Sequence, residues 1–402
     1  MKLLDPLIQW HEEIKTIRRD LHAHPEIAFE EQRTSDIVAK YLESWGIPIE
    51  RGLGGTGVVG IVKGDQPGDC AIGLRADMDA LPMQELNTFP HASKHEGKMH
   101  GCGHDGHTAM LLAAAKYLAQ HRDFAGTVYL IFQPAEEGGN AGARKMIEDG
   151  LFKKFPMNAV FGMHNWPGMP AGQFGVTSGP IMASSNLFTI SVEGKGCHAG
   201  MPHLGQDPIM ATVQIASALQ TIVSRNRHPM QAAVLSITQI HAGSAMNVIP
   251  GEAEIKGTVR TFTNETLDMV EARMKEISAS IAQAMGCVAK VDFQRKYPPT
   301  INSEKETQLC IEVMRSIVGS DNVDPKVTPT MGAEDFAFML QEVPGCYVWI
   351  GNGTGDHREH GHGMGPCMLH NGSYDFNDEL LPLGATYWVR LVETWFRNKG
   401  NY

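Results

Sequence analysis

The chain has 402 residues, more than one hydrophobic core usually serves, so two or three domains are expected. With 42% hydrophobic and 20% charged residues it has the composition of a globular protein, and no stretch reaches the roughly 18 consecutive apolar residues that a membrane-spanning helix needs. The formal net charge of −11, without a long run of lysine or arginine, argues against nucleic acid or a membrane surface as the main partner.

The N-terminal segment meets Asp5 and further charges too early to hold the apolar core of a signal peptide, which favours a cytoplasmic location. The seven cysteines are odd in number and irregular in spacing, so a disulfide framework is not expected. This leaves three interpretations of Cys102 in "MHGCGHDGH" (99–107): a buried thiol, a nucleophile or a metal ligand.

Helices and short apolar strands alternate over the first 180 residues. Helices are predicted at 6–21, 34–45 and 106–121, and strands at 57–62, 70–76, 127–133 and 159–164. Because these strands are apolar throughout, they indicate an α/β layer whose sheet is largely parallel and buried on both faces.

The pattern changes near residue 186, where apolar and polar residues begin to alternate. The predicted order is strand, helix, strand, strand, helix, strand, with the second helix capped by Asn264. This order is typical of a ferredoxin-like α+β domain. We therefore expect an inserted domain at 186–296 within a first domain formed by 1–185 and 297–402.

Residues with reactive side chains directly follow three of the predicted strands of the first domain. Asp77 follows one strand, Glu136 and Glu137 follow the next, and His164 ends the third. Ligand sites in α/β sheets gather at the carboxyl ends of the strands, so these side chains are expected at one rim.

Cys102 and His104 run into the helix predicted near 106, and a helix N-terminus favours the thiolate form of a cysteine. His370 adds a further imidazole. Cysteine, histidine and glutamate donors suit zinc, cobalt, manganese or iron rather than calcium or magnesium. Five such donors exceed the needs of one tetrahedral ion and suggest two neighbouring ions. A hydrolase with Cys102 as nucleophile is the alternative.

These residues, in this order, resemble the metal-dependent amidohydrolase family of hippurate hydrolases, N-acyl-amino-acid amidohydrolases and auxin-conjugate (IAA-amino acid) hydrolases, relatives of aminoacylase and carboxypeptidase. The match covers nearly the whole chain. Its motifs include "RRDLHAHPE" (18–26), "LRADMDALP" (74–82), "MHGCGHDGHTAML" (99–111), "FQPAEEG" (132–138), "GMHN" (162–165), "GAEDFA" (332–337) and "LHNGSYDFND" (369–378). The resemblance implies a zinc-exopeptidase-like α/β/α catalytic domain and an inserted ferredoxin-like domain that serves as lid and dimerisation domain.

The resemblance also implies roles for the residues at the rim. Two divalent metal ions per subunit, manganese or zinc with cobalt or nickel as alternatives, are expected on a set of five ligands, with Cys102 shared: Cys102, His104, Glu137, His164 and His370. Glu136 aligns with the general base, and Asp77 with an aspartate beside the ligands. Arg75 stands where zinc relatives have a histidine ligand, so it is not assigned to metal.

In the inserted domain, the resemblance implies that His198 polarises the scissile carbonyl and that Asn247 and Arg260 bind the substrate carboxylate. Cys197 stands where relatives usually have glycine, which leaves its effect on His198 open. The segment "HREHGHG" (357–363) is predicted to be a polar loop.

The expected activity is hydrolysis of the amide bond of an N-acyl amino acid to a carboxylic acid and a free amino acid, by a homodimer or homotetramer formed through the inserted domain. Acetyl, benzoyl and indole-acetyl groups all stay open as the acyl part. The alternatives are a metallo-carboxypeptidase or dipeptidase acting on short peptides, a Cys102-dependent hydrolase, and a binding protein without catalysis.

Overall fold

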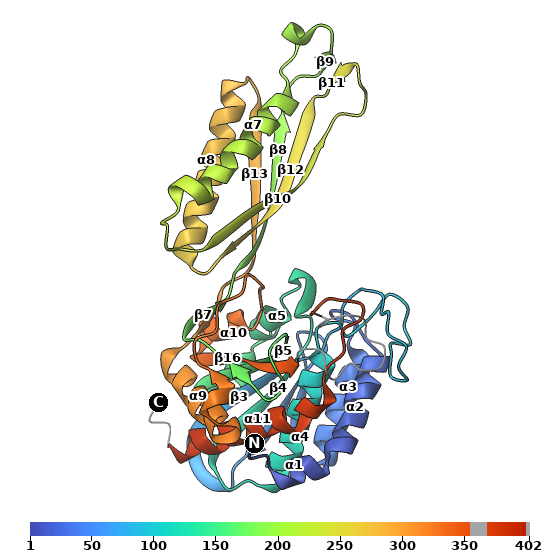
Figure 1. The fold of residues 1–402 in the computed structure, drawn as a ribbon, viewed down its shortest axis with the longest axis vertical. Helices are drawn as coiled ribbons and strands as arrows, with labels where there is room; N and C mark the ends of the chain where they lie inside the picture. Colours follow the sequence, from blue (N-terminus) through green and yellow to red (C-terminus); the bar gives the residue numbers. More distant parts are fainter. Residues whose placement is uncertain (354–367, 399–402) are drawn as a thin grey trace. The chain divides into compact units, whose positions relative to one another are not determined.

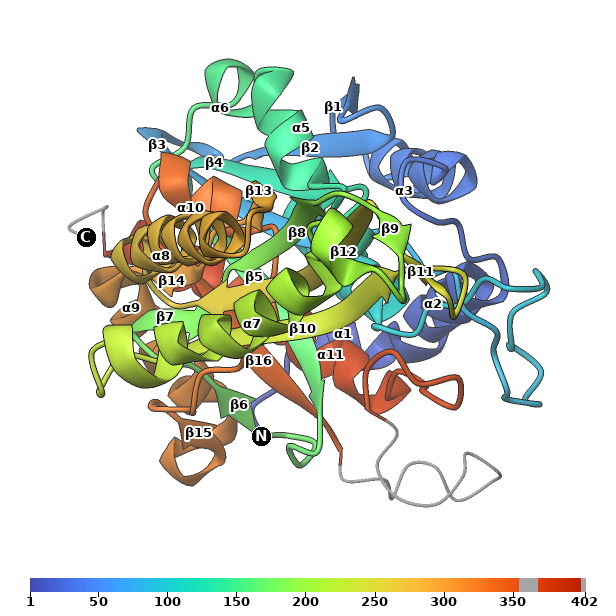
Figure 2. The same cartoon turned by 90° about the horizontal axis from the view of Figure 1, so that it is seen from above.

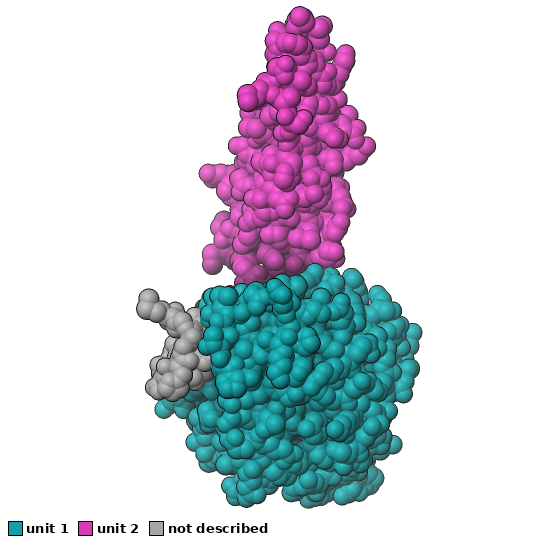
Figure 3. Space-filling view, turned by 90° about the vertical axis from the view of Figure 1, so that its right-hand side faces the viewer, with its two compact units in different colours: residues 1–181, 301–328, 335–402 teal, residues 182–300, 329–334 magenta. Residues whose placement is uncertain are grey.

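A computed structural model describes residues 1–353 and 368–398, and the chain divides into two compact units (Figure 3). Unit 1 comprises Met1–Ile181, Ile301–Thr328 and Asp335–Tyr402, and unit 2 comprises Met182–Thr300 and Pro329–Glu334. The insertion expected at 186–296 lies inside unit 2. Unit 2 also takes in residues 329–334, which sequence reasoning placed in the catalytic domain. The histidine-rich segment at 357–363 lies outside the described residues.

Unit 1 is built on one eight-stranded sheet. Its strands in spatial order are β1 (Ile49–Leu53), β2 (Gly57–Lys63), β4 (Ala125–Gln133), β3 (Gln66–Asp77), β5 (Ala159–Pro167), β16 (Gly345–Gly353), β6 (Phe174–Gly175) and β15 (Val323–Asp324). The four central strands, β4, β3, β5 and β16, are parallel to one another. The pairs β1/β2, β2/β4 and β16/β6 are antiparallel, so the sheet is mixed and the largely parallel prediction holds only for its centre.

Helices cover both faces of this sheet. Every residue of β16 and nearly every residue of β5 is buried, and because neighbouring side chains on a strand point to opposite faces, neither face meets solvent. Figures 1 and 2 show α5 on one side and α11 on the other, and Figure 2 also shows α6 beside α5. The helices of unit 1 are α1 (Asp5–Gln9), α2 (His11–Ala23), α3 (Gln32–Ser44), α4 (His104–Gln120), α5 (Gly142–Glu148), α6 (Leu151–Lys154), α9 (Glu304–Val318), α10 (Ala337–Glu342) and α11 (Leu381–Arg397).

Two helices differ from the sequence-based expectation in ways that bear on the site. The helix predicted at 6–21 is two helices separated at Trp10. Helix α4 starts at His104 rather than near 106, with Gly103 before it in a left-handed conformation at φ 90°. An added Cβ on Gly103 would overlap Asn165 and Tyr374, so only glycine fits between Cys102 and His104.

Unit 2 confirms the ferredoxin-like prediction. Its main sheet has the order β10-β12-β8-β13 with every neighbouring pair antiparallel. The elements are β8 (Ser185–Glu193), α7 (Pro208–Thr221), β10 (Ala233–Ala242), β12 (Glu252–Thr261), α8 (Asn264–Ala284) and β13 (Val288–Tyr297), with a small sheet of β9 (Cys197–His198) and β11 (Val248–Ile249). A two-stranded sheet of β7 (Gly179–Met182) and β14 (Thr300–Asn302) lies where the chain passes between the units. The cap of α8 is Thr263, whose side chain accepts a hydrogen bond from the Thr266 N–H, and not Asn264.

Alternating residues of β8 form the core of unit 2. Phe188, Ile190 and Val192 are buried together with Ile215 of α7 and Met274 of α8.

Across both units, the described residues include no helix with the length and apolar character of a membrane-spanning segment.

Gly384 of α11 sets how closely that helix packs on α4, and it supports a stability prediction. A Cβ at this position would overlap the sulfur of the buried Met110, so in Gly384→Ala the Met110 side chain or the helix itself has to shift. We expect a loss of about 1–3 kcal/mol in the free energy of unfolding of unit 1. All six tryptophans lie in unit 1, so the midpoint of denaturant unfolding followed by tryptophan fluorescence measures it.

Gly251→Ala is the matched control, because its Cβ would meet nothing closer than 4.0 Å. Equal midpoints for the two variants would contradict this account of the helix contact.

Candidate metal centre

The reactive side chains of unit 1 gather at the carboxyl ends of β3, β4 and β5. These three strands are parallel neighbours, in the order β4-β3-β5. Asp77 is the last residue of β3, Glu136 and Glu137 follow the end of β4, and His164 lies near the end of β5. The structure therefore brings the predicted rim residues together, as expected of parallel strands.

Among the groups of possible metal ligands that the described residues form, three overlap at this rim through Cys102, His104 and Glu137, each with its donor atoms within 4.8 Å of one another. The groups are Cys102/His104/His164, Cys102/Glu137/His370 and His104/Glu136/Glu137. All of these residues are buried except His370, whose side chain is 53% exposed. Cys102, His104 and Glu137 each belong to two of these three groups, and overlapping groups are what two neighbouring ions require.

The hydrogen bonds of His104 and His164 direct one ring nitrogen of each toward the rim. Nδ1 of His104 donates to the carbonyl oxygen of Asp79 at 2.8 Å, and Nδ1 of His164 donates to that of Asn165 at 2.6 Å. In each ring Nε2 is therefore the nitrogen that would offer its lone pair to a metal ion. Nε2 of His164 lies 3.3 Å from the Cys102 sulfur, and Nε2 of His370 lies 3.1 Å from Glu137.

One buried atom shows directly that the residues fit a metal. Nε2 of His104 has no hydrogen-bond partner among the described residues, and the oxygen of Asp77, 3.6 Å away, is too distant to serve as one. A buried nitrogen without a partner is costly, and a cation at the rim would satisfy it. The donor set of thiol, imidazole and carboxylate is that of zinc or a similar transition ion.

The electrostatics of the rim favour a cation. Burial, together with the charges of Glu137 and Glu136, raises the pKa of the Cys102 thiol well above its usual value. Burial lowers the pKa of His104, but Asp77 and Asp79 outweigh it and raise that pKa to about 10. The expectation that the start of α4 favours the thiolate is therefore wrong for the protein alone. The thiolate needs a cation that offsets the carboxylates.

Asp79 positions both glutamates, a role that the sequence interpretation missed. Its two carboxylate oxygens accept hydrogen bonds from the backbone N–H groups of Glu136 at 3.0 Å and Glu137 at 2.9 Å. Its carbonyl oxygen accepts from His104. The only signal in the sequence was its place two residues after Asp77, and the backbone groups that it binds leave no trace there.

Asp77 forms a further group of possible metal ligands with His104 and His107, but its two carboxylate oxygens already accept hydrogen bonds within the protein. One carboxylate oxygen accepts from Nδ1 of His107 at 2.6 Å, and the other from Arg75 at 2.8 Å. Nε2 of His107 accepts from the Asn165 backbone at 3.0 Å, so both nitrogens of this ring are engaged within the protein. Arg75 also pairs with Asp335 at 3.1 Å, in keeping with its exclusion from the ligand set.

Residues of the motif at 18–26 form hydrogen bonds and ion pairs with the first turn of α4. Arg18 and His22 both bind the carboxylate of Asp105, the residue after His104, at 3.4 Å and 2.8 Å. Burial lowers the pKa of His22, but Asp105 and Glu85 outweigh it and raise the value to about 9. A charged histidine and an arginine thus hold the ligand-bearing helix in place.

The predicted substrate residues of the inserted domain are described within unit 2 alone. Nδ1 of His198 accepts from the Gly200 N–H at 3.0 Å, which places the ring proton on Nε2. The Ala199 N–H donates to the carbonyl oxygen of Asn247 at 3.0 Å and holds the two segments together. The roles of His198 and Asn247 toward a substrate stay predictions.

Arg260 lies on the polar face of β12 with Glu254 and Lys256, as the alternation predicted. Glu254 and Lys256 pair with each other at 2.8 Å, whereas the half-buried Arg260 has no hydrogen bond or ion pair with any residue that the structure describes. Burial lowers the pKa of its guanidinium. An arginine in this state is available to an anionic ligand.

The fold and the site together define a class, the α/β metallohydrolases. The sheet of unit 1 has a parallel centre covered by helices, and cysteine, histidine and glutamate donors lie at the carboxyl ends of its strands. Unit 2 is a ferredoxin-like insertion. Residues 73–394 match the model of Peptidase family M20/M25/M40. The chain belongs to this family.

Relatives and solved structures agree with this assignment. The chain is 41% identical to hippurate hydrolase of Campylobacter jejuni over 98% of its own length and 99% of that protein, and 40% identical to N-acetylcysteine deacetylase of Bacillus subtilis over 95% and 97%. The structure is also similar to that of YxeP of Bacillus subtilis, a dinuclear metal binding peptidase from the M20 family, with a TM-score of 0.83, 36% identity and coverage of 97% and 99%.

The double acceptor role of Asp79 gives a prediction. Asp79→Asn replaces one acceptor oxygen by a donor that faces a backbone N–H group, so the turn that carries Glu136 and Glu137 shifts. We expect the affinity for divalent metal to fall by roughly 10- to 100-fold, measured by metal titration of the metal-free protein.

Asp207→Asn is the control, because the Asp207 carboxylate also accepts two backbone N–H bonds, from Ile209 and Met210, but in unit 2. Unchanged metal affinity in Asp79→Asn would show that the glutamates are positioned by other contacts.

Proposed function

We propose that this chain is a metal-dependent amidohydrolase that cleaves N-acyl amino acids to a carboxylic acid and a free amino acid. The observation that carries the proposal is the buried carboxylate of Glu136 beside a cluster of five possible metal ligands. The similarity to hippurate hydrolase and N-acetylcysteine deacetylase, over nearly the full length of each, supports the substrate class.

The proposed cofactors are two divalent ions, manganese or zinc, with cobalt or nickel as alternatives. The residues that would hold them are Cys102, shared between both, with His104, Glu137, His164 and His370. When bound, such ions polarise an amide carbonyl and make water a better nucleophile at neutral pH. The carboxylate of Glu137 would be a metal ligand, whereas that of Glu136 would accept and deliver a proton.

Glu136 is the proposed general base. Its backbone N–H is fixed by Asp79, and its side chain is 7% exposed at the rim. Glu136 takes a proton from the water whose oxygen adds to the carbonyl carbon. It then delivers that proton to the amide nitrogen as the C–N bond breaks, so the amine leaves neutral and the acyl group leaves as the acid.

We further propose that three residues of unit 2 bind the substrate. Arg260, which has no partner among the described residues, and Asn247 would bind the α-carboxylate of the amino acid part. Nε2–H of His198 would donate a hydrogen bond to the carbonyl oxygen, where negative charge develops. Cys197 beside it contributes a half-buried thiol to this part of the site.

The proposed assembly is a homodimer, or a homotetramer, formed through unit 2. Met210 at 50% and Val213 at 48% exposure give the outer face of α7 an apolar character that supports this. The proposed location is the cytoplasm. The six cysteines among the described residues are all without a disulfide, which agrees with a reducing compartment.

Removal of the metal tests the class of mechanism. We expect that dialysis against a chelator abolishes hydrolysis of hippurate and N-acetylcysteine, and that added manganese or zinc restores it, measured as release of the free amino acid. Full activity of the metal-free protein would favour the Cys102-dependent alternative. A larger kcat/KM for dipeptides than for N-acyl amino acids would favour a peptidase.

The two neighbouring glutamates offer a matched pair of variants. Glu136→Gln is expected to keep its metal content but to lose kcat by roughly 10²–10⁴-fold, because it can no longer accept a proton. Glu137→Gln is expected to lose metal as well as activity. Metal analysis and steady-state kinetics on both variants distinguish the roles, and full turnover by metal-loaded Glu136→Gln would contradict the mechanism.

A further inference from the structure

A second hollow in unit 1, of about 400 Å³, lies at the edge of the sheet opposite the metal centre. Cys70 lies in the first half of β3, Asn158 directly precedes β5 and Pro344 directly precedes β16, so the hollow faces the amino ends of the parallel strands. The six steps along the chain from Asn158 to His164 span ~20 Å at the rise of an extended strand. The hollow is therefore separate from the metal centre.

The wall of the hollow includes the first turn of α9, where a common helix cap does not form. Ser303 and Glu306 have the spacing of a capping box, in which the glutamate carboxylate accepts from the serine N–H. Here the Ser303 N–H donates to the carbonyl oxygen of Gly345 at 2.9 Å, and the Ser303 hydroxyl accepts from the Gly345 N–H at 3.2 Å. The backbone of Gly345, the first residue of β16, thus takes the place of the Glu306 carboxylate.

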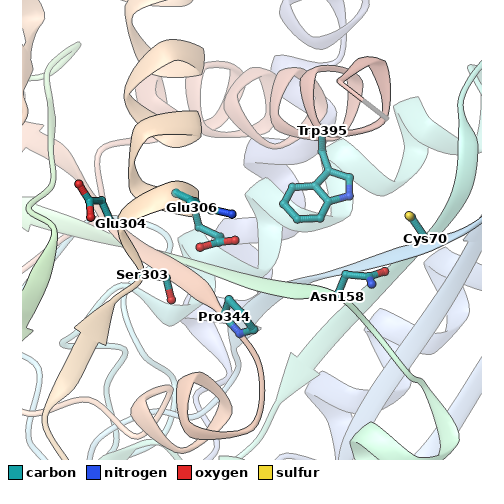
Figure 4. A pocket seen from close by; sticks show the side chains of 8 residues that line it. Cys70, Asn158, Ser303, Glu304, Glu306, Pro344 and Trp395 are labelled. Atoms are coloured by element: carbon teal, nitrogen blue, oxygen red, sulfur yellow. The ribbon is translucent and has the colours of Figure 1, made fainter. Parts of the chain in front are cut away.

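Glu306 is left buried without a partner. The residue is only 5% exposed, and its carboxylate makes no hydrogen bond or ion pair with any residue that the structure describes. Figure 4 shows this carboxylate and the indole ring of Trp395 facing the same hollow, with Cys70 and Asn158 across from Glu306. Burying a carboxylate without a partner is costly, so a ligand that supplies the opposite charge would stabilise this arrangement.

The other walls decide which cation fits. Glu306 belongs to no group of metal-ligating side chains among the described residues, and it is the one buried charged residue of the lining, beside the apolar rings of Trp395 and Pro344. The lining also includes the exposed residues Glu304 and Lys305, whose opposite charges offset each other. An indole ring attracts an organic cation through its π-electrons, and a carboxylate binds an ammonium group by a charge-assisted hydrogen bond. We propose that this hollow binds a small organic ammonium ion, with Glu306 as its carboxylate partner. The inference does not depend on the proposed reaction.

Calorimetric titration of the zinc-loaded full chain with n-butylammonium tests the proposal. We expect saturable binding that Glu306→Gln weakens at least about tenfold, the loss of a hydrogen bond to a charged group. Glu312→Gln, an exposed glutamate on the same helix, is the control and should bind as the unmodified protein does. 1-Butanol, similar in shape but uncharged, should not bind.

Thermal unfolding, followed by tryptophan fluorescence, gives an independent measurement. Without amine, Glu306→Gln should unfold at or above the temperature of the unmodified protein, because it removes an unpartnered buried charge. Added n-butylammonium should raise the midpoint of the unmodified protein and not that of the variant. Absence of amine binding, equal binding by Glu306→Gln, equal binding of 1-butanol, or a midpoint several degrees lower in Glu306→Gln would each overturn the proposal.

Discussion

The two hydrogen bonds from the backbone of Glu136 and Glu137 to Asp79 are the interaction on which the rest of the metal centre depends. Consecutive residues of a strand point their side chains to opposite faces, so two neighbouring glutamates reach one rim only if the chain turns sharply after β4. The carboxylate of Asp79 holds that turn, and its carbonyl group orients His104. Asp79 thus positions Glu136, the proposed general base, and the proposed ligands Glu137 and His104.

The concentration of negative charge at the rim is the second constraint. Asp77, Asp79, Glu136 and Glu137 are all buried at or near the carboxyl ends of β3 and β4. Burial raises the pKa of Asp77, but the positive charges of His104 and Arg75 outweigh it and lower that pKa most. The raised pKa of Cys102 follows from this excess. Folding of the rim and binding of cations are therefore coupled, since each lowers the free-energy cost of the other.

Much of this site could be predicted from the sequence because its residues follow strong apolar strands. The carboxyl-end rule placed Asp77, Glu136 and His164 together, and the alternation of β12 placed Arg260 on a polar face. The ferredoxin-like insertion was likewise readable from its order of elements.

The rest of the site depends on contacts between side chains and backbone groups that lie far apart in the chain. The roles of Asp79 and His107 rest on such backbone partners, and the pKa of Cys102 rests on charges that converge only in the fold. The antiparallel flanks of the central sheet depend on which strands pair and in which direction, and the apolar pattern of a single strand such as β2 carries no information on either.

The order of the segments along the chain has a consequence for co-translational folding. Strand β5 pairs with β16, and Glu137 meets His370, so unit 1 needs segments that are made before and after the insertion. Unit 2 is almost entirely one continuous stretch. The insertion can therefore fold during synthesis before unit 1 is complete. Until β16 has been made, β5 is an unpaired sheet edge, and the nascent chain must be protected from aggregation during that interval.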